Sequence, residues 1–336
     1  FMFDVVAIGN ALVDTEYELS EAILTATGLS RGTMTLADTP AQNALFAALS
    51  AQGIKPTKRC GGGSAANSMV AFASLGGRAF YHCRVGADET GQFYLADLAK
   101  SGVTTNAVHA VTTGETGTCA VLVTPDAERT MQTHLGASAD IHGDNVDFDV
   151  MAGAKYLYLE GYLAMSPQIM PAIDQLCTLA KQNGTKIVVS FADPAVVNFA
   201  KDGLLTWLGF GVDKIFCNLD EAKLFAQTDD SEQAVTTLLN HAKTVIVTCG
   251  KEPTLIGTHN PTPSITAVPV PQAVQVVDTN GAGDNFAGAF LYGLTQGMNL
   301  PDCVTLAGTV ASQVVAQFGA RLDKQGYQSA KNSVIG

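Results

Sequence analysis

The residues with the clearest chemistry lie at 278–284, where the chain has the string Asp-Thr-Asn-Gly-Ala-Gly-Asp. The turn 280–283 carries almost no side chain, so its backbone N–H groups can approach a ligand closely. Apolar residues at helical spacing, such as Phe286 and Phe290, predict that a helix begins at this turn and adds its positive dipole end to an anion site. Asp284 places a carboxylate in that site. A general base explains its presence, because a carboxylate can take a proton from a hydroxyl while the turn holds the phosphoryl group being transferred.

The residues on either side of the turn indicate how it is positioned. Val276 and Val277 are β-branched and predict the end of a strand just before it. A simpler interpretation of the segment is a helix start with glycines in the turn and an aspartate at the favourable end of the dipole. A Walker phosphate loop is excluded, because no Gly-Lys-Ser/Thr follows the glycines.

The string at 278–284 resembles the signature near the C-terminus of the ribokinase-like kinases, the pfkB family of carbohydrate and nucleoside kinases. The resemblance implies that Asp284 is the catalytic base. It also implies that the residues of the turn form the anion hole for the phosphoryl group, namely Gly281, Ala282 and Gly283.

Two further residues of this signature receive roles from the resemblance. It implies that Thr279 lies in the nucleotide site. It also implies that Asp278 is a ligand of a monovalent cation such as K⁺, which the family often uses near this signature. The other ligands of that cation cannot be placed from the sequence.

Two earlier segments carry the residues expected to bind the substrate. Asn10 and Asp14 follow a short apolar strand predicted at 4–8, and by themselves they are equally explained as a turn cap and a solvated acid. In the family the matching aspartate binds two hydroxyls of a sugar or ribose ring, which suits a carboxylate with two acceptor oxygens.

The resemblance adds the string Gly-Gly-Ser-Ala-Ala-Asn-Ser at 62–68 to this substrate site, with Gly62, Gly63 and Asn67 as its binding residues. The pattern Gly-Gly-x-x-x-Asn-Ser is closer to adenosine and inosine kinases than to ribokinase. Ribokinase-type sequences commonly have Gly-Lys-Gly-Ala-Asn here, and this chain lacks that lysine.

Asn218 and Glu221 match the family's Asn-x-x-Glu motif, which is implied to organise Mg²⁺ and its waters beside the ATP phosphates. Their i, i+3 spacing puts them on one face of a helix start, and Mg²⁺ keeps several of its waters. A helix N-cap at Asn218 followed by an acid in the first turn also explains the pair, and both interpretations can hold together.

Thr248 and Gly250 match the start of the family's Thr-x-Gly-x-x-Gly, which lies beside ATP. Pro253 stands where the second glycine is expected and fixes its φ near −65°, so the nucleotide loop is expected to differ after Gly250.

Segments 118–124 and 129–134 alternate in hydrophobicity on either side of Pro125-Asp126 and predict a hairpin. The hairpin resembles the lid of the same family, and Arg129 in it is a candidate for contact with substrate or phosphate. An exposed hairpin with a charged turn explains these residues as well.

Strand and helix patterns alternate from about residue 154 onward, which argues for a mostly parallel sheet with helices on both faces. Candidate polar groups follow several of these strands, so we expect them to gather at one edge of the sheet. The resemblance implies a ribokinase-like three-layer α/β/α fold with a small β lid. We expect a large domain of 1–13, 60–111 and 139–336, and a lid of 14–59 and 112–138, two segments poor in helical periodicity.

Composition narrows the functional classes. The 336 residues include 19 Lys and Arg against 31 Asp and Glu, and a net charge of −12 argues against binding to a nucleic-acid backbone. No apolar run is long enough to span a bilayer and no signal-peptide pattern opens the chain, so we expect a cytoplasmic protein. The seven dispersed cysteines indicate reduced thiols. Oligomeric state is left open between monomer and homodimer.

The leading hypothesis is a kinase that uses ATP and Mg²⁺ to phosphorylate a primary hydroxyl, with adenosine or a related purine nucleoside favoured. A sugar kinase of the same family, acting on ribose, fructose or 2-keto-3-deoxygluconate, is the alternative. A dinucleotide-binding oxidoreductase is disfavoured, because Gly-x-Gly-x-x-Gly does not follow the first strand. A non-catalytic sensor would not need the base at Asp284.

Overall fold

The computed structural model describes residues 2–126, 128–259 and 261–335. Its larger sheet contains nine strands, β1 (Val5–Ile8), β5 (Ala79–His82), β7 (Val103–Thr104), β11 (Tyr156–Glu160), β12 (Lys186–Ser190), β13 (Val212–Asn218), β14 (Ala242–Cys249), β15 (Glu252–His259) and β16 (Pro263–Val268). They lie in the order β16-β15-β14-β13-β12-β11-β1-β5-β7. All pairings from β14 to β7 are parallel, whereas β15 and β16 add an antiparallel edge. The predicted mostly parallel central sheet is confirmed.

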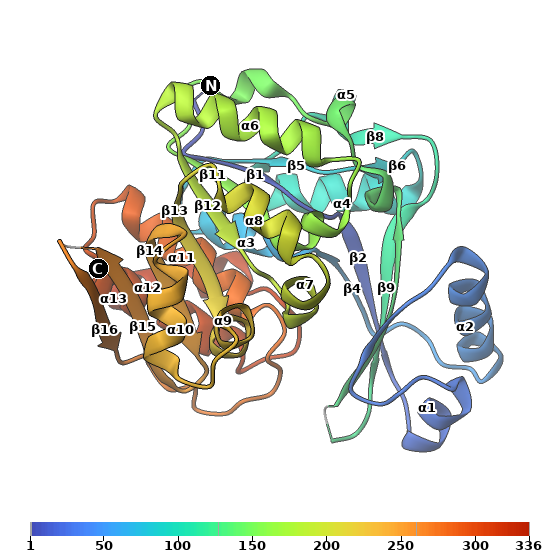
Figure 1. Ribbon diagram of the computed structural model, residues 1–336. Helices are drawn as coiled ribbons and strands as arrows, with labels where there is room; N and C mark the ends of the chain where they lie inside the picture. Colours follow the sequence, from blue (N-terminus) through green and yellow to red (C-terminus); the bar gives the residue numbers. More distant parts are fainter. Residues whose placement is uncertain (1, 127, 260, 336) are drawn as a thin grey trace.

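Helices cover both faces of this sheet (Figure 1). Successive strand residues point to opposite faces, so Val5 and Ala7 of β1 pack into one core while Val6 and Ile8 pack into the other. The first core is covered by α3 (Ser64–Ser74), α4 (Glu89–Lys100), α11 (Ala282–Thr295), α12 (Leu300–Val314) and α13 (Lys324–Ile335). The second is covered by α6 (Met170–Asn183), α7 (Pro194–Phe199), α8 (Lys201–Leu208), α9 (Leu219–Ala226) and α10 (Ser231–Leu238). Burial on both faces explains why the strands are almost continuously apolar.

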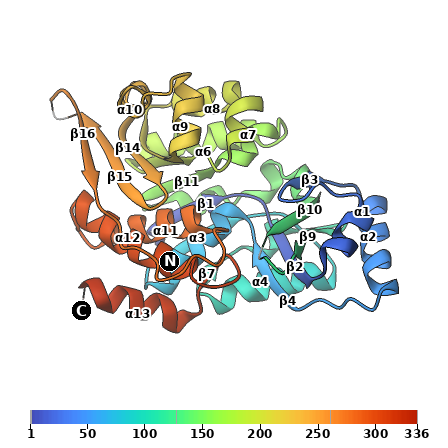
Figure 2. The same ribbon diagram turned by 90° about the horizontal axis from the view of Figure 1, so that it is seen from below.

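A smaller five-stranded sheet projects from this body, as Figures 1 and 2 show. It consists of β2 (Leu12–Glu18), β3 (Met34–Leu36), β4 (Lys58–Gly62), β9 (Thr116–Val123) and β10 (Arg129–Gly136), in the order β3-β10-β9-β2-β4. We call this sheet, together with the helices α1 (Glu21–Thr27) and α2 (Thr39–Ala51), the lid. The helices pack on one face of the sheet through a core that includes Tyr17, Leu45 and Leu122.

The two lid helices were not expected, because the segment 14–59 lacks clear helical periodicity. Each begins instead at a local N-cap, where the Ser20 or Asp38 side chain accepts from a backbone N–H three residues later. The hairpin of β9 and β10 confirms the sequence prediction. The division into two domains at the predicted boundaries is kept as a proposal, and the strands of the small sheet extend to Leu12 and Gly62.

The strand predicted at Val276 and Val277 is wrong. Residues 269–281 contain neither helix nor strand, and Val276 is largely exposed. The Val277 N–H donates to the carbonyl of Val315, just past the end of α12, at 2.7 Å. This segment is therefore held by a helix end and not by a neighbouring strand.

The remaining elements are short. They are the strands β6 (Val85–Gly86) and β8 (Val111–Thr112), the helix α5 (Ala107–Ala110), and 3₁₀ turns at Ala137–Asp140, Gly143–Asn145, Phe148–Met151 and Gly161–Met165. Within the described ranges, no helix combines the length and the apolar character needed to cross a bilayer.

Candidate active site

Asp284 lies in the first turn of α11, where two side chains of α3 donate to its carboxylate. The Ser64 hydroxyl donates to Oδ1 at 2.6 Å, and the Asn67 amide donates to Oδ2 at 3.0 Å. Burial raises the pKa of Asp284, while these two hydrogen bonds and the charge of Arg321 oppose the rise. The N-terminal ends of α3 and α11 therefore meet at a carboxylate that is both oriented and made more basic.

The turn before Asp284 has the conformation that its glycines permit. Gly281 is the N-cap of α11 with φ 73°, and a Cβ there would lie 2.5 Å from the carbonyl oxygen of Ala320. The N–H groups of Gly283 and Asp284 belong to the first helical turn, where the helix supplies no carbonyl partner. A Cβ at Gly283 would meet no described atom within 4 Å, so this side of the turn has room for a ligand.

Asn285, which follows Asp284, holds the turn in place through hydrogen bonds of its side chain. Its amide donates to the carbonyl oxygens of Gly281 and Ala320, each at 2.7 Å, and its Oδ1 accepts from the Tyr327 hydroxyl at 2.5 Å. Asn285 is fully buried. Asn285 is not among the residues predicted from the sequence, although its position directly after the predicted base was a local signal.

Asp14 lies within β2, a strand of the lid sheet. Its carboxylate covers Gly62 so closely that a Cβ on this glycine would lie 2.6 Å from Asp14 Oδ1. Burial, helped by the charge of Glu16, raises the pKa of Asp14 to about 7 against the opposing charges of Arg321 and Arg129. Gly62 is therefore needed for the close approach of the Asp14 carboxylate.

Asn10 is held through its backbone by a carboxylate that the sequence analysis missed. Glu160, at the end of β11, accepts from the Asn10 N–H at 3.1 Å through Oε1 and from the Ala65 N–H at 2.7 Å through Oε2. Glu160 is fully buried, which raises its pKa to about 7. Glu160 therefore links the end of β1 to the start of α3. In the sequence, the feature that could have indicated Glu160 is an acidic residue at the end of an apolar strand. Gly63 adopts φ 96° directly against the Asn10 carbonyl, which leaves no room for a side chain.

Arg321 sets the orientation of Asn67. Its Nε donates to Asn67 Oδ1 at 2.7 Å, and Nη1 donates to Asp97 Oδ2 at 2.7 Å. With Oδ1 bound to the guanidinium, the amide nitrogen of Asn67 must face Asp284. A chain of contacts therefore runs from Asp97 through Arg321 and Asn67 to Asp284, and neither Asp97 nor Arg321 was identified from the sequence.

Asn218 and Glu221 form the N-terminal cap of α9. The Asn218 side chain accepts from the Glu221 N–H at 2.8 Å, while Glu221 accepts from the Asn218 backbone at 3.0 Å and from its side-chain amide at 2.8 Å. Burial, together with the nearby charges of Asp193 and Asp284, raises the pKa of Glu221 to about 7. The structure thus contains the predicted cap, and its Glu221 carboxylate is close enough to Asp284 to be affected by the charge of that residue.

The expected nucleotide residues lie beside this cap. Thr248 of β14 is the register partner of Asn218 in the neighbouring strand. Gly250 has φ 61° in the tight turn between β14 and β15. Pro253 lies inside β15, so the chain turns back at Gly250 and does not continue into the glycine-rich loop of the motif.

Asp278 and Thr279 precede the turn. Thr279 is exposed, whereas Asp278 is buried. The Asp278 carboxylate accepts N–H bonds from Asn280 and Gly319 and pairs with Arg129 of β10. Arg129 is therefore in contact with the signature, and the exposed-hairpin interpretation does not describe it.

Comparisons with known proteins agree with this geometry. The model of the pfkB family of carbohydrate kinases matches residues 40–325. An adenosine kinase from Saccharomyces cerevisiae is 31% identical over 331 residues, covering 94% of this chain and 95% of the relative. The crystal structure of an adenosine kinase from Sinorhizobium meliloti superposes with a TM-score of 0.88 at 31% identity, covering 99% of this chain and all of that one. A probable sugar kinase from Rhizobium etli gives a TM-score of 0.86 at 32% identity, with 98% of each chain covered.

Three observations support one assignment. They are the family match, the three-layer fold and the position of Asp284 beside the glycine turn. This chain belongs to the pfkB family of carbohydrate kinases, and it is a phosphotransferase with an alcohol group as acceptor.

Proposed function

We propose that the protein phosphorylates the primary hydroxyl of a purine nucleoside, with adenosine favoured, at the expense of ATP. The observation that carries the proposal is the carboxylate of Asp284 at the N-terminus of α11, held by Ser64 and Asn67 beside a turn with room for a phosphoryl group. A base in this position takes the proton of the attacking hydroxyl, and N–H groups at the turn 281–283 and the start of α11, those of Gly283 and Asp284, stabilise the charge on the transferred group.

Asp14 supports a substrate with a vicinal diol. It is the register partner of Cys60 in β4 and of Cys119 in β9, so these three side chains share one face of the lid sheet. A carboxylate in the middle of that row can accept from two neighbouring hydroxyls of a ribose ring. Asn10 and Asn67 complete the proposed ring contacts from the large lobe.

The face of the lid that carries Asp14 favours a nucleoside over a free sugar. Cys119 and Val121 of β9 lie on this face, and Met131 of β10 is the register partner of Val121. Met34, the partner of Met131 in β3, continues the apolar surface and is 45% exposed. A purine base can bury its faces against such a surface, whereas a free sugar offers mainly hydroxyls.

ATP is proposed to bind on the large lobe near Thr248, Gly250 and Thr279. The oxygen donors of Asn218 and Glu221 suit Mg²⁺, and because Glu221 is already bound to Asn218, we propose that they hold the ion through its waters. When bound, Mg²⁺ neutralises charge on the phosphates. The lid, closed over the site, would keep out water that could otherwise hydrolyse ATP.

A sugar kinase is the second candidate, because the Rhizobium etli relative is described as a probable sugar kinase. A coupled assay of ADP release over adenosine, inosine, guanosine, ribose, fructose and 2-keto-3-deoxygluconate separates the two. We expect ADP formation that depends on a purine nucleoside. Turnover with a free sugar only would overturn the nucleoside assignment, and binding without turnover of any acceptor would overturn the kinase assignment.

A further inference from the structure

The carboxylate of Asp278 is already bound by three donors. Its side chain is 3% exposed, Oδ1 accepts from the Asn280 N–H at 3.0 Å, and Oδ2 accepts from the Gly319 N–H at 2.9 Å. The third donor is the guanidinium of Arg129, whose Nη2 lies 2.7 Å from the same Oδ2. All three groups that contact the two carboxylate oxygens of Asp278 are N–H donors. A bound cation would instead be surrounded by oxygen ligands.

The counter-charge of Asp278 is a guanidinium that it shares with a second carboxylate, and another cation lies nearby. Arg129 Nη2 lies 3.3 Å from Glu16 Oε1, so one guanidinium nitrogen serves two carboxylates. Lys58 is the register partner of Glu16 in β4, and its ammonium donates to the carbonyl of Phe318 at 3.2 Å, one residue before Gly319. Arg129 therefore serves Asp278 and Glu16 together, and a monovalent cation at Asp278 would have to compete with the guanidinium for Oδ2.

We propose that Arg129 takes the place of the monovalent cation that the family resemblance assigns to Asp278. The guanidinium neutralises the buried carboxylate and links β10 of the lid to the signature. The stability and the activity of this protein are then independent of K⁺. The inference does not depend on which alcohol is phosphorylated.

Arg129 acts in this proposal as a positioning residue. Asp278 holds the N–H groups of Asn280 and Gly319, which are the neighbours of Gly281 and Ala320 in the turn beside Asp284. A carboxylate without a counter-charge would be costly in this buried place. The arginine therefore lets Asp278 stay ionised and keep both loops in place.

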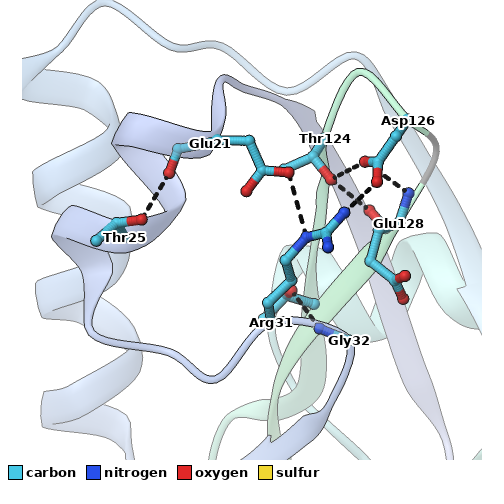
Figure 3. A network of polar contacts seen from close by, with 8 residues as sticks. Glu21, Thr25, Arg31, Gly32, Thr124, Asp126 and Glu128 are labelled. Carbon is cyan, nitrogen blue, oxygen red and sulfur yellow. Dashed lines mark hydrogen bonds and ion pairs between the residues drawn. The ribbon is translucent and has the colours of Figure 1, made fainter.

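The test compares thermal unfolding of the ligand-free protein in KCl, NaCl and choline chloride at equal ionic strength. The variants are Arg129→Gln, which leaves Asp278 without its cation, and Arg129→Lys, which keeps the charge. Arg31→Gln is the matched control. Arg31 is another lid arginine with two carboxylate partners (Figure 3), but its side chain is 45% exposed, and these partners, Glu21 of α1 and Asp126 of the β9–β10 hairpin, both belong to the lid.

For the wild type, for Arg129→Lys and for Arg31→Gln, we expect each protein's unfolding temperature to be the same in KCl as in choline chloride. Arg129→Gln should be less stable, and K⁺ should raise its midpoint by about 2–4 °C over choline, because the vacated carboxylate then binds the ion. A midpoint of the wild type that rises with K⁺ would overturn the proposal, as would an Arg129→Gln protein that shows no gain from K⁺.

If Arg129→Gln does not fold in any of the three salts, the unfolding of the wild type and of Arg129→Lys decides whether K⁺ binds at Asp278. Activation of wild-type turnover by K⁺ would then count against the proposal. A failure of the nucleoside assignment would appear in the acceptor panel and leave the unfolding measurements unchanged. The two proposals therefore fail separately.

Discussion

Replacing Asp284 by Asn tests the central chemical assignment, because the structure can accept the new side chain. The amide oxygen of the substituted side chain would take the hydrogen bond from Asn67, and its NH₂ group would donate to Ser64 Oγ, whose hydroxyl can rotate to accept. The two hydrogen bonds and the turn 281–283 stay in place. What disappears is the ability to accept a proton.

The expected loss follows from that single change. General-base catalysis contributes roughly 10²–10⁴-fold, so kcat of Asp284→Asn should fall at least about 100-fold, which corresponds to roughly 2.7 kcal/mol in the barrier. The anion hole is intact, and binding of ATP and nucleoside should therefore be almost unchanged. Because burial raises the pKa of Asp284, its ionised form disfavours folding as the pH rises. The variant should consequently be at least as stable as the wild type at pH 8.

The assay is initial-rate ADP release at saturating ATP and adenosine, with ligand affinities from calorimetry and midpoints from thermal unfolding. Asp302→Asn is the control, since Asp302 is likewise the third residue of a helix, α12, and lies on the surface. It should leave kcat unchanged. An Asp284→Asn enzyme with kcat within a few-fold of the wild type and unchanged affinities would refute the base assignment.

Substitutions at three further residues test the surroundings of Asp284. Arg321→Gln should lower kcat by up to about 100-fold, because Asn67 loses the contact that orients it, and it should also lower the thermal midpoint. Arg321→Lys lacks the forked guanidinium and should recover only part of the lost rate and of the lost stability. Equal rates for the wild type and both variants would contradict a role of Arg321 in orienting Asn67. Asp14→Asn should weaken nucleoside binding, yet it should raise the thermal midpoint more at pH 8 than at pH 5. The pKa of Asp14 is raised by folding, so its contribution to stability is largest at low pH and is lost as the pH rises through about 7. An equal gain in the midpoint at pH 5 and pH 8 would refute this reasoning. Glu160→Gln should destabilise by roughly 1–3 kcal/mol in chemical denaturation, since one of two backbone N–H groups would face an NH₂ group, and an unchanged denaturation midpoint would show that the two amides find other partners.

The sequence predicted the parts of the fold that depend on local pattern. The parallel strands of the large sheet were visible as buried apolar runs separated by helical stretches, and α11 was visible from Phe286 and Phe290. Val276 and Val277 gave the wrong prediction because β-branched residues favour strands only where a partner strand is present, and here the partner is a helix end.

The candidate site was predictable only where its residues are neighbours in the chain. Asp284 and its turn lie within one string, and Asn218 with Glu221 lies within another. Glu160 and Arg321 contribute through contacts with residues 95 to 254 positions away, and no local spacing records such contacts. The same holds for Arg129, which touches the signature only because β10 of the lid folds over it.

The carboxylates of this site show why the chain carries groups that work against its own stability. Asp14, Glu160 and Asp284 come from three different elements, and burial raises the pKa of each. A structure selected for stability alone would pair such groups or replace them by apolar residues. Glu160 is compensated by two backbone amides, and Asp284 by Ser64, Asn67 and the charge of Arg321. Asp14 is compensated only by the charges of Arg321 and Arg129, and no hydrogen-bond donor to its carboxylate is found among the described residues, so a diol would supply donors that it lacks. Asp14 is thus both the carboxylate that lacks hydrogen-bond donors and the one proposed to bind the substrate. The cost of burying it is offset only when the hydroxyls of the substrate are present.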